Sequence, residues 1–249
     1  MDTASLIYAA LILLGASFVQ AMIGFAFNLL AIPLLIWSGF SLGQSIAITA
    51  IPILIQLLIS AFKQRRSLVA DDLALGIGVR FVTLPIGIML LYTLDQLDPN
   101  TIKPFVGAVL LLIVLSEWFV HFVPRAHLGR GWDLLAFGMS GLMLGVIGMG
   151  GPPIVLWLMA HDWPPKRSRA FVTWLFLASA PIQIGLLYWK LDETALKGFA
   201  IGTALLPIVI VGTLLGNWIG DRFDEKRFKQ IVHLFLLLTA LISIVSPLL

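Results

Sequence analysis

Two glycine-containing stretches interrupt the two longest apolar runs of this chain, and they lie 124 positions apart. The first stretch covers residues 23–28 and the second covers residues 147–152. The same spacing aligns Thr49 with Thr173, and near the end of each half an acidic turn leads into a leucine-rich run at a spacing of 126. This spacing is far longer than the short period of a solenoid, so the sequence predicts two copies of one unit.

The composition shows that water is not the main solvent of this protein. Hydrophobic residues make up 59% of the 249 residues and charged residues 12%, whereas an average soluble domain has about 25% charged residues. Runs such as residues 110–115 lack the alternation of outer-membrane strands, which favours helices. Most of the apolar segments suit one crossing of about 20 residues. These segments are residues 4–36, 43–62, 73–94, 103–123, 132–160, 169–189, 197–220 and 228–248.

The positions of lysine and arginine favour one topology. If all eight segments crossed once, seven basic residues would lie inside and eight outside, which is no bias. If residues 4–36 and 132–160 each turn back at their glycines, twelve lie inside and three outside, as the positive-inside rule expects. Each half then has three net crossings, so the second copy is inverted and both termini lie outside the cytoplasm. A single kinked or tilted helix for each long segment is the alternative.

The second interruption is a candidate anion site. Gly148, Gly150 and Gly151 supply backbone N–H groups, and Pro152 suits the first turn of a new helix. Irregular backbone at membrane depth survives only where it is buried in protein or lines a watery cavity. Because a helix N-terminus attracts anions, we expect these four residues to bind an anionic substrate. Close helix packing is the alternative role for the glycines.

The first interruption offers three more candidate binding residues. Asn28 takes the place of Pro152, and Gly24 begins the stretch. Gln20 precedes the break by one helical turn, so its side chain is expected to face the same cavity. The sequence therefore places Gln20, Gly24 and Asn28 in the predicted site.

Three ionisable residues within apolar segments are further candidates. Arg80 is the one basic residue well inside such a segment, and an intramembrane charge predicts function by default. We expect Arg80 to bind the anion and Glu117 and His233 to serve proton coupling. An Arg80–Glu117 ion pair of purely structural role is the alternative. The chain has no cysteine and no metal-binding spacing, so we expect no cofactor and no metal.

Other polar and small residues have simpler interpretations. Gln56 and Gln183 could point toward the interface between the repeats, although such residues more often form hydrogen bonds between helices. Three glycine series with a four-residue spacing predict helix-packing faces. They are Gly141/Gly145, Gly198/Gly202 and Gly212/Gly216/Gly220.

One pattern raises an enzymatic alternative. Residues 138–141 have the Gly-x-Ser-Gly form found around the nucleophile of rhomboid-type intramembrane proteases, and His233 is the base that could be proposed for Ser140. The pattern is short and common in membrane helices. A protease also gives no reason for duplication across the whole chain.

Residues 24–35 and 145–156 resemble the two signature segments of the TauE/SafE sulfite-exporter family of membrane permeases. The resemblance extends over nearly the whole chain, including the Arg169-Ala170 step after the second signature. It implies a bacterial inner-membrane carrier for sulfite, sulfoacetate or related sulfur-containing and organic anions. Many members have further glycines in the first signature where this chain has Ala26, Phe27 and Asn28, so the substrate stays open.

Together these observations predict an all-α polytopic membrane protein with two inverted repeats. Each repeat is expected to hold a broken or re-entrant helical hairpin plus three transmembrane helices, about eight to ten helical segments in all. Repeat one spans about residues 4–123 and repeat two about residues 132–248 of a single transporter domain, in the manner of secondary transporters.

The predicted function is transport of a small anion by alternating access, with a substrate site where the repeats meet. An anion channel is the main alternative and an intramembrane enzyme is a weaker one. The expected partners are the anion and the lipid bilayer, with no nucleic acid. The coupling ion, the direction of transport and homo-oligomer formation are left open by the sequence.

Overall fold

The computed structural model describes residues 3–23, 26–64, 70–119, 129–220 and 225–245, and the regular elements of this part are all helices. In chain order they are α1 (Thr3–Ile23), α2 (Phe27–Trp37), α3 (Leu42–Gln64), α4 (Ala70–Leu94), α5 (Pro99–Phe119), α6 (Arg130–Ile147), α7 (Gly151–Met159), α8 (Pro165–Leu191), α9 (Glu193–Ala204), α10 (Leu206–Gly220) and α11 (Glu225–Val245).

Several of these helices have the length and composition of membrane spans. Within the described residues, α1, α3, α4 and α8 are each long and apolar enough to cross a membrane, and α9 and α10, which meet at a bend of 52°, make a fifth candidate if the pair is one span. Shorter apolar helices lie within α2, α5 and α11. The prediction of a multi-pass helical membrane protein is therefore confirmed.

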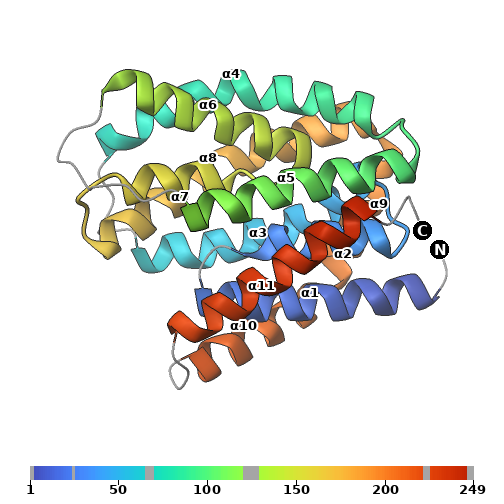
Figure 1. Ribbon diagram of the computed structural model, residues 1–249. Coiled ribbons are helices and arrows are strands. Elements are labelled where there is room, and N and C mark those ends of the chain that lie inside the picture. Colours follow the sequence, from blue (N-terminus) through green and yellow to red (C-terminus); the bar gives the residue numbers. More distant parts are fainter. Residues whose placement is uncertain (1–2, 24–25, 65–69, 120–128, 221–224, 246–249) are drawn as a thin grey trace. The chain divides into compact units, whose positions relative to one another are not determined.

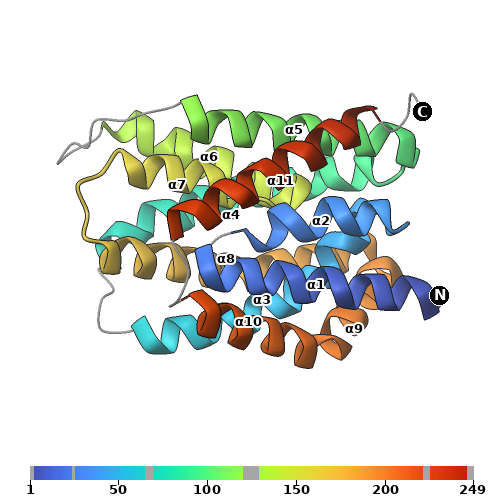
Figure 2. The ribbon, with the colours of Figure 1, turned by 60° about the horizontal axis from the view of Figure 1, so that its bottom comes forward.

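Both long apolar runs break at the predicted glycines, and the chain then reverses. The first helix of each run ends at Ile23 or Ile147, and the second begins at Phe27 or Gly151. In both views of the ribbon, α2 runs back beside α1 and α7 runs back beside α6 (Figures 1 and 2). Each run is therefore a helical hairpin and not one kinked helix.

The helices recur in the second half at the spacing seen in the sequence. The starts of α2 and α7 are 124 positions apart, and the starts of α5 and α11 are 126 apart. The bent pair α9–α10 takes the place of α4. This bend, at Leu205, departs from the single segment 197–220 of the sequence interpretation and raises the number of described helices to eleven. The inverted orientation of the halves stays a prediction.

The chain divides into two compact units that do not follow the two halves of the sequence. Unit 1 comprises residues Met1–Pro52, Thr93–Trp118 and Thr194–Leu249, and unit 2 comprises Ile53–Tyr92 and Phe119–Glu193. Unit 1 therefore contains the first hairpin with α10, whereas unit 2 contains the second hairpin with α4. Each hairpin shares its unit with a span from the other half of the chain.

In unit 1, glycines let helix backbones approach closely. A Cβ built on Gly216 of α10 would collide with the carbonyl oxygen of Phe18 on α1. A Cβ on Gly198 of α9 would lie 2.5 Å from that of Ala47 on α3. The described members of the second and third glycine series are thus packing residues, as predicted, and Gly220 has no described side-chain environment.

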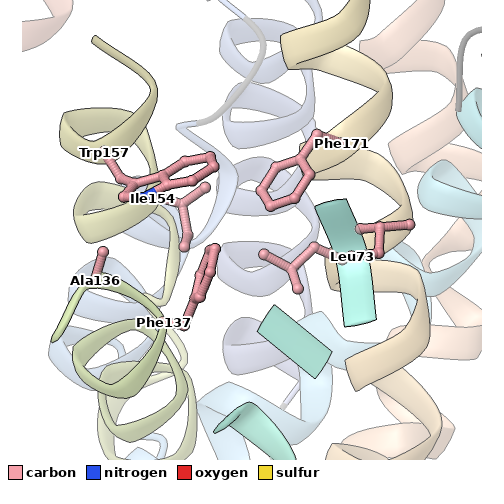
Figure 3. Packing of buried hydrophobic residues seen from close by; sticks show 7 residues of the cluster. Leu73, Ala136, Phe137, Ile154, Trp157 and Phe171 are labelled. Carbon is pink, nitrogen blue, oxygen red and sulfur yellow. The ribbon is translucent and has the colours of Figure 1, made fainter. Parts of the chain in front are cut away.

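In unit 2, α4 crosses α6 through glycines as well. A Cβ on Gly145 would lie 2.7 Å from the Cα of Gly87, so the prediction for Gly141/Gly145 is confirmed too. Elsewhere in unit 2, side chains of α4, α6, α7 and α8 form an apolar cluster (Figure 3). The Trp157 and Phe171 rings stack with centroids 5.1 Å apart. The cluster consists of Leu73, Ala136, Phe137, Ile154, Trp157, Phe171 and Leu175.

Candidate functional site

The second break has a backbone that its glycines make possible. Gly148 ends α6 in the left-handed conformation, with φ at 69°, which strongly favours glycine. Its N–H donates to the carbonyl of Leu144 at 3.1 Å, and the N–H of Met149 donates to that of Met143 at 3.2 Å. These bonds satisfy carbonyls at the end of α6 and fix the direction in which the chain leaves the helix.

The residues after Gly148 bring the start of α7 close to α6. A Cβ on Gly150 would lie 2.7 Å from both the carbonyl oxygen of Ser140 and the Cβ of Leu144, so a side chain there has no room. Gly151 begins α7, and the following Pro152 is buried in the first turn, where a missing N–H is tolerated. A Cβ on Gly151 would meet no heavy atom within 4 Å. Gly150 is thus the sterically constrained glycine of this pair.

Arg80 reaches this break from α4. It is only 1% exposed, and among the described residues it is the largest fully buried side chain. Nη1 donates to Ser179 Oγ at 3.2 Å and to the Leu175 carbonyl at 3.5 Å, and Nη2 donates to Ser140 Oγ. The Phe176 ring lies 4.1 Å from Cζ, at a distance typical of a cation–π contact. Three helices therefore contribute to the surroundings of this guanidinium. Arg80 lies on α4, residues of α6 and α8 contact it, and Ser140 links it to Gly150, the residue before α7.

The charge of Arg80 is not neutralised within the described residues. Its hydrogen-bond acceptors are two hydroxyls and one carbonyl, all uncharged, and its Nε has no hydrogen-bond partner there. A buried cation is costly unless it is paired with an opposite charge. This guanidinium therefore favours an anion as its missing partner.

Ser140 connects Arg80 to the break. Its oxygen accepts the hydrogen bond from Arg80 Nη2, and its proton is donated to the carbonyl of Gly150. The sequence predicted Arg80 and Gly150 as binding residues on separate grounds, and in the structure this hydroxyl links them. Sequence reasoning considered Ser140 only as a nucleophile and missed Ser179 entirely.

Gln183 supports the same break from α8. Its Nε2 donates to the carbonyl of Leu144 at 3.1 Å, the oxygen that also accepts the N–H of Gly148. Gln183 lies four residues after Ser179, so both side chains are on one face of α8. The sequence interpretation left open whether Gln183 faces the interface between the repeats. In the structure, its amide bonds to α6 within unit 2.

With this geometry in place, comparison with known proteins assigns the family. The model of the family described as "Sulfite exporter TauE/SafE" matches residues 8–242. The chain belongs to this family. The resemblance seen in the two signature segments is therefore confirmed, and the chain is a membrane transport protein.

A curated relative agrees with this assignment. The "Probable sulfite/organosulfonate exporter TauE" of Cupriavidus necator is 25% identical to this chain over 226 residues, which is 88% of this chain and 86% of the relative. No solved structure matches the chain at a significant level.

The first break, in unit 1, holds a different set of groups. Gln20 Oε1 accepts the N–H of Phe27 at 3.0 Å and so caps the start of α2. Asn28 lies in the first turn of α2 and is half-buried, and Gly24 lies outside the described residues. Asn28 thus lies in the first turn of α2 and Gln20 in the last turn of α1, and their binding of a substrate stays a prediction.

The two residues predicted for proton coupling lie on helices of the leucine-rich runs. His233 of α11 is buried, with 6% of its surface exposed. Glu117 lies in α5, but its side chain is outside the described residues. The Arg80–Glu117 ion pair therefore stays untested.

The hydrogen bonds of Ser140 bear on the protease alternative. Its proton is committed to the Gly150 carbonyl, whereas an activated serine gives its proton to a base such as histidine. The arrangement fits a structural hydroxyl. It is consistent with the family assignment, whose description names an exporter.

A cleft of about 580 Å³ opens in unit 1 at the other end of the first hairpin. Its described lining comes from the start of α1 and the end of α2, and these residues contribute hydroxyls and an indole but no charged side chain. The lining residues are Ser5, Tyr8, Ile12, Leu34, Trp37, Ser38 and Gly39. With no charge to select an anion, this cleft does not have the chemistry of the Arg80 site.

Proposed function

We propose that this protein is a secondary transporter that moves a small sulfur oxyanion, sulfite or an organosulfonate, across the bacterial inner membrane. The observation that carries the proposal is the buried Arg80 guanidinium, which has neutral hydrogen-bond partners and lies one hydroxyl away from a glycine-rich helix break. The curated relative is named a probable exporter of sulfite and organosulfonate, which supports this substrate class.

A guanidinium suits this class of substrate. Its planar N–H groups form a fork that matches two oxygens of a tetrahedral or trigonal oxyanion, and charge-assisted bonds of this kind are about twice as strong as neutral ones. The N–H groups of Gly150 and Gly151 add to the site at the start of α7, which carries the positive end of a helix dipole, whereas the N–H groups of Gly148 and Met149 are already donated to carbonyls of α6. Arg80, Gly148, Gly150, Gly151 and Pro152 together form the proposed binding region.

The proposed mechanism is alternating access between two inverted halves. The recurrence of the helix order at a spacing of 124 to 126 supports two copies of one module, and the distribution of basic residues supports their inversion. Export and import use the same architecture, and the gradients set the direction. Proton coupling through Glu117 and His233 is part of the proposal, to be tested by flux under an imposed pH gradient.

Flux into reconstituted vesicles tests this function. The panel is sulfite, sulfate, thiosulfate, sulfoacetate and small carboxylates, with the parent compared to Arg80→Gln and Gly150→Leu. We expect saturable uptake of sulfite or sulfoacetate by the parent and a loss of about tenfold or more in each variant, the size of one lost charge-assisted hydrogen bond or more.

Two matched variants serve as controls. Arg130→Gln removes an exposed arginine at the start of α6, and Gly78→Leu changes an exposed glycine two residues from Arg80, where a Cβ would meet no heavy atom within 4 Å. Both are expected to transport at nearly the parent rate. Parent-like transport by Arg80→Gln and Gly150→Leu would contradict the proposed site, and non-saturating flux would favour the channel alternative.

A further inference from the structure

Ser140 lies between Arg80 and the second break and is bonded to both. It is fully buried on α6, and its one hydroxyl joins the guanidinium of Arg80 to the backbone of the second break. A serine hydroxyl has one proton and two lone pairs, so a single rotamer of Ser140 makes both bonds. Rotation about χ1 to another staggered position would therefore break the two bonds together.

The guanidinium presents a partly open edge to an incoming anion. Among the described residues, Nε has no hydrogen-bond partner, and Nη2, which carries an N–H parallel to that of Nε in the planar fork, donates to Ser140. An oxyanion that binds Nε and Nη2 together competes with the Ser140 oxygen for Nη2. It does so with the stronger bond, because a charged acceptor outcompetes a neutral hydroxyl.

Ser179 resembles Ser140 in its burial and in its hydrogen bond from Arg80, and it differs in where its own proton is donated. Its hydroxyl also accepts a hydrogen bond from Arg80, through Nη1, and it is also buried. However, its own proton is donated at 2.8 Å to Leu175, one turn earlier on its own helix, α8. Loss of Ser179 thus weakens the hold on Arg80 without freeing the break.

We propose that Ser140 is the positioning residue that couples anion binding at Arg80 to movement of the second helix break. Two oxygens of the anion bind Nε and Nη2, the Ser140 hydroxyl rotates away, and the Gly150 carbonyl loses its hydrogen bond. Gly150 and the start of α7 then lose this tie to α6, while the N–H groups of Gly148 and Met149 stay bonded to the last carbonyls of α6. This inference rests on the proposed function and assigns the step by which a bound substrate changes the hairpin.

Amide hydrogen exchange of the full-length protein in detergent, followed for peptides that cover residues 143–156, tests the coupling. The probe is sulfoacetate. In the parent, we expect sulfoacetate to speed exchange of these amides. Ser140→Ala should exchange fast without the anion and show no further change, whereas Ser179→Ala should respond as the parent does at a higher sulfoacetate concentration.

Transport kinetics distinguish a coupling role of Ser140 from a purely structural role. In Ser140→Ala, the anion no longer displaces a hydroxyl, so KM should not rise, while the maximal rate falls about tenfold or more because binding no longer changes the break. In Ser179→Ala, KM should rise about tenfold and the maximal rate should stay close to that of the parent. If Ser140→Ala and Ser179→Ala changed KM and the maximal rate in the same way, the coupling role of Ser140 would be overturned.

Arg80→Gln separates this inference from the proposed function. Ser140 keeps its bond to Gly150 in this variant, so exchange without sulfoacetate should match the parent, and the response to sulfoacetate should vanish. Absence of flux in the parent, with the exchange response intact, would contradict the transport proposal alone. A sulfoacetate response retained in Ser140→Ala, or absent in a parent that transports, would overturn the coupling.

Discussion

Single residues carry the chemistry of this site, and their predictability from sequence differs sharply. Arg80 could be predicted, because one arginine in a run of apolar residues is rare and costly. Ser140 and Ser179 could not, because small hydroxyl residues are frequent in membrane helices and their facing depends on packing. The roles of Gln20, which caps α2, and of Gln183, which bonds to α6, could not be predicted from the local sequence either, because they depend on tertiary contacts.

Close backbone approach at Gly216 gives a stability prediction. Gly216→Ala places a Cβ against the carbonyl oxygen of Phe18, which is backbone and cannot move aside cheaply. We expect a loss of about 1–3 kcal/mol, as for other overpacked positions. Unfolding in detergent measures the change.

The matched control for Gly216 is Gly15 on α1, where a Cβ would meet no heavy atom within 4 Å. Gly15→Ala should leave stability unchanged or raise it by up to about 1 kcal/mol, since alanine is the better helix former. Equal effects of the two substitutions would show that α10 does not approach α1 as closely as described.

At the scale of elements, the hairpins follow from the sequence, and the bend between α9 and α10 does not. Glycines placed at equal positions in two long apolar runs predict both breaks. Proline gives no such signal here, because Pro52, Pro85, Pro104 and Pro181 lie inside helices that continue through them. Pro207 lies in the first turn of α10, directly after the break between α9 and α10. The sequence alone does not distinguish it from the four prolines inside helices.

The acidic turn that closes the first half caps a helix of the same half. Asp95 accepts the N–H of Gly43 at 2.7 Å and the Ser41 hydroxyl at 3.2 Å, next to the start of α3. Asp95→Ala should therefore destabilise the protein by about 1 kcal/mol, the usual contribution of such a cap. Asp95→Asn keeps an acceptor oxygen and should recover part of the loss. Thermal unfolding of the three proteins in one detergent decides the point, and an Asp95→Ala variant as stable as the parent would contradict the capping role.

For the whole molecule, the two compact units repeat one packing arrangement. In unit 1, a Cβ on Gly216 would meet the carbonyl of Phe18, and in unit 2, a Cβ on Gly87 would lie 2.5 Å from that of Leu142. Phe18 and Leu142 are 124 positions apart, so each hairpin packs against the fourth span of the other half in the same register. In this register, the residue of unit 1 that corresponds to Arg80 of unit 2 is Val209, which is buried. The sequence repeat predicted the similarity of the halves but not this exchange of spans.

The predicted inversion of the halves has a consequence for topology. The parent has no cysteine, so a single introduced cysteine reports which side of the membrane it faces. Both Asn100, in the first turn of α5, and Asp162, between α7 and α8, are exposed. Asn100→Cys should react only with reagents from the periplasmic side and Asp162→Cys only from the cytoplasmic side, as the distribution of basic residues requires. Reaction of both from the periplasmic side would contradict the inverted arrangement.

The central claim is that Arg80 holds the transported anion beside the second break. Equilibrium binding of sulfoacetate to the purified protein tests it most directly, because binding is measured apart from coupling and turnover. We predict that Arg80→Gln raises the dissociation constant by about tenfold to a hundredfold, whereas Arg130→Gln leaves it within about twofold of the parent. An Arg80→Gln variant that binds sulfoacetate as tightly as the parent would contradict the claim.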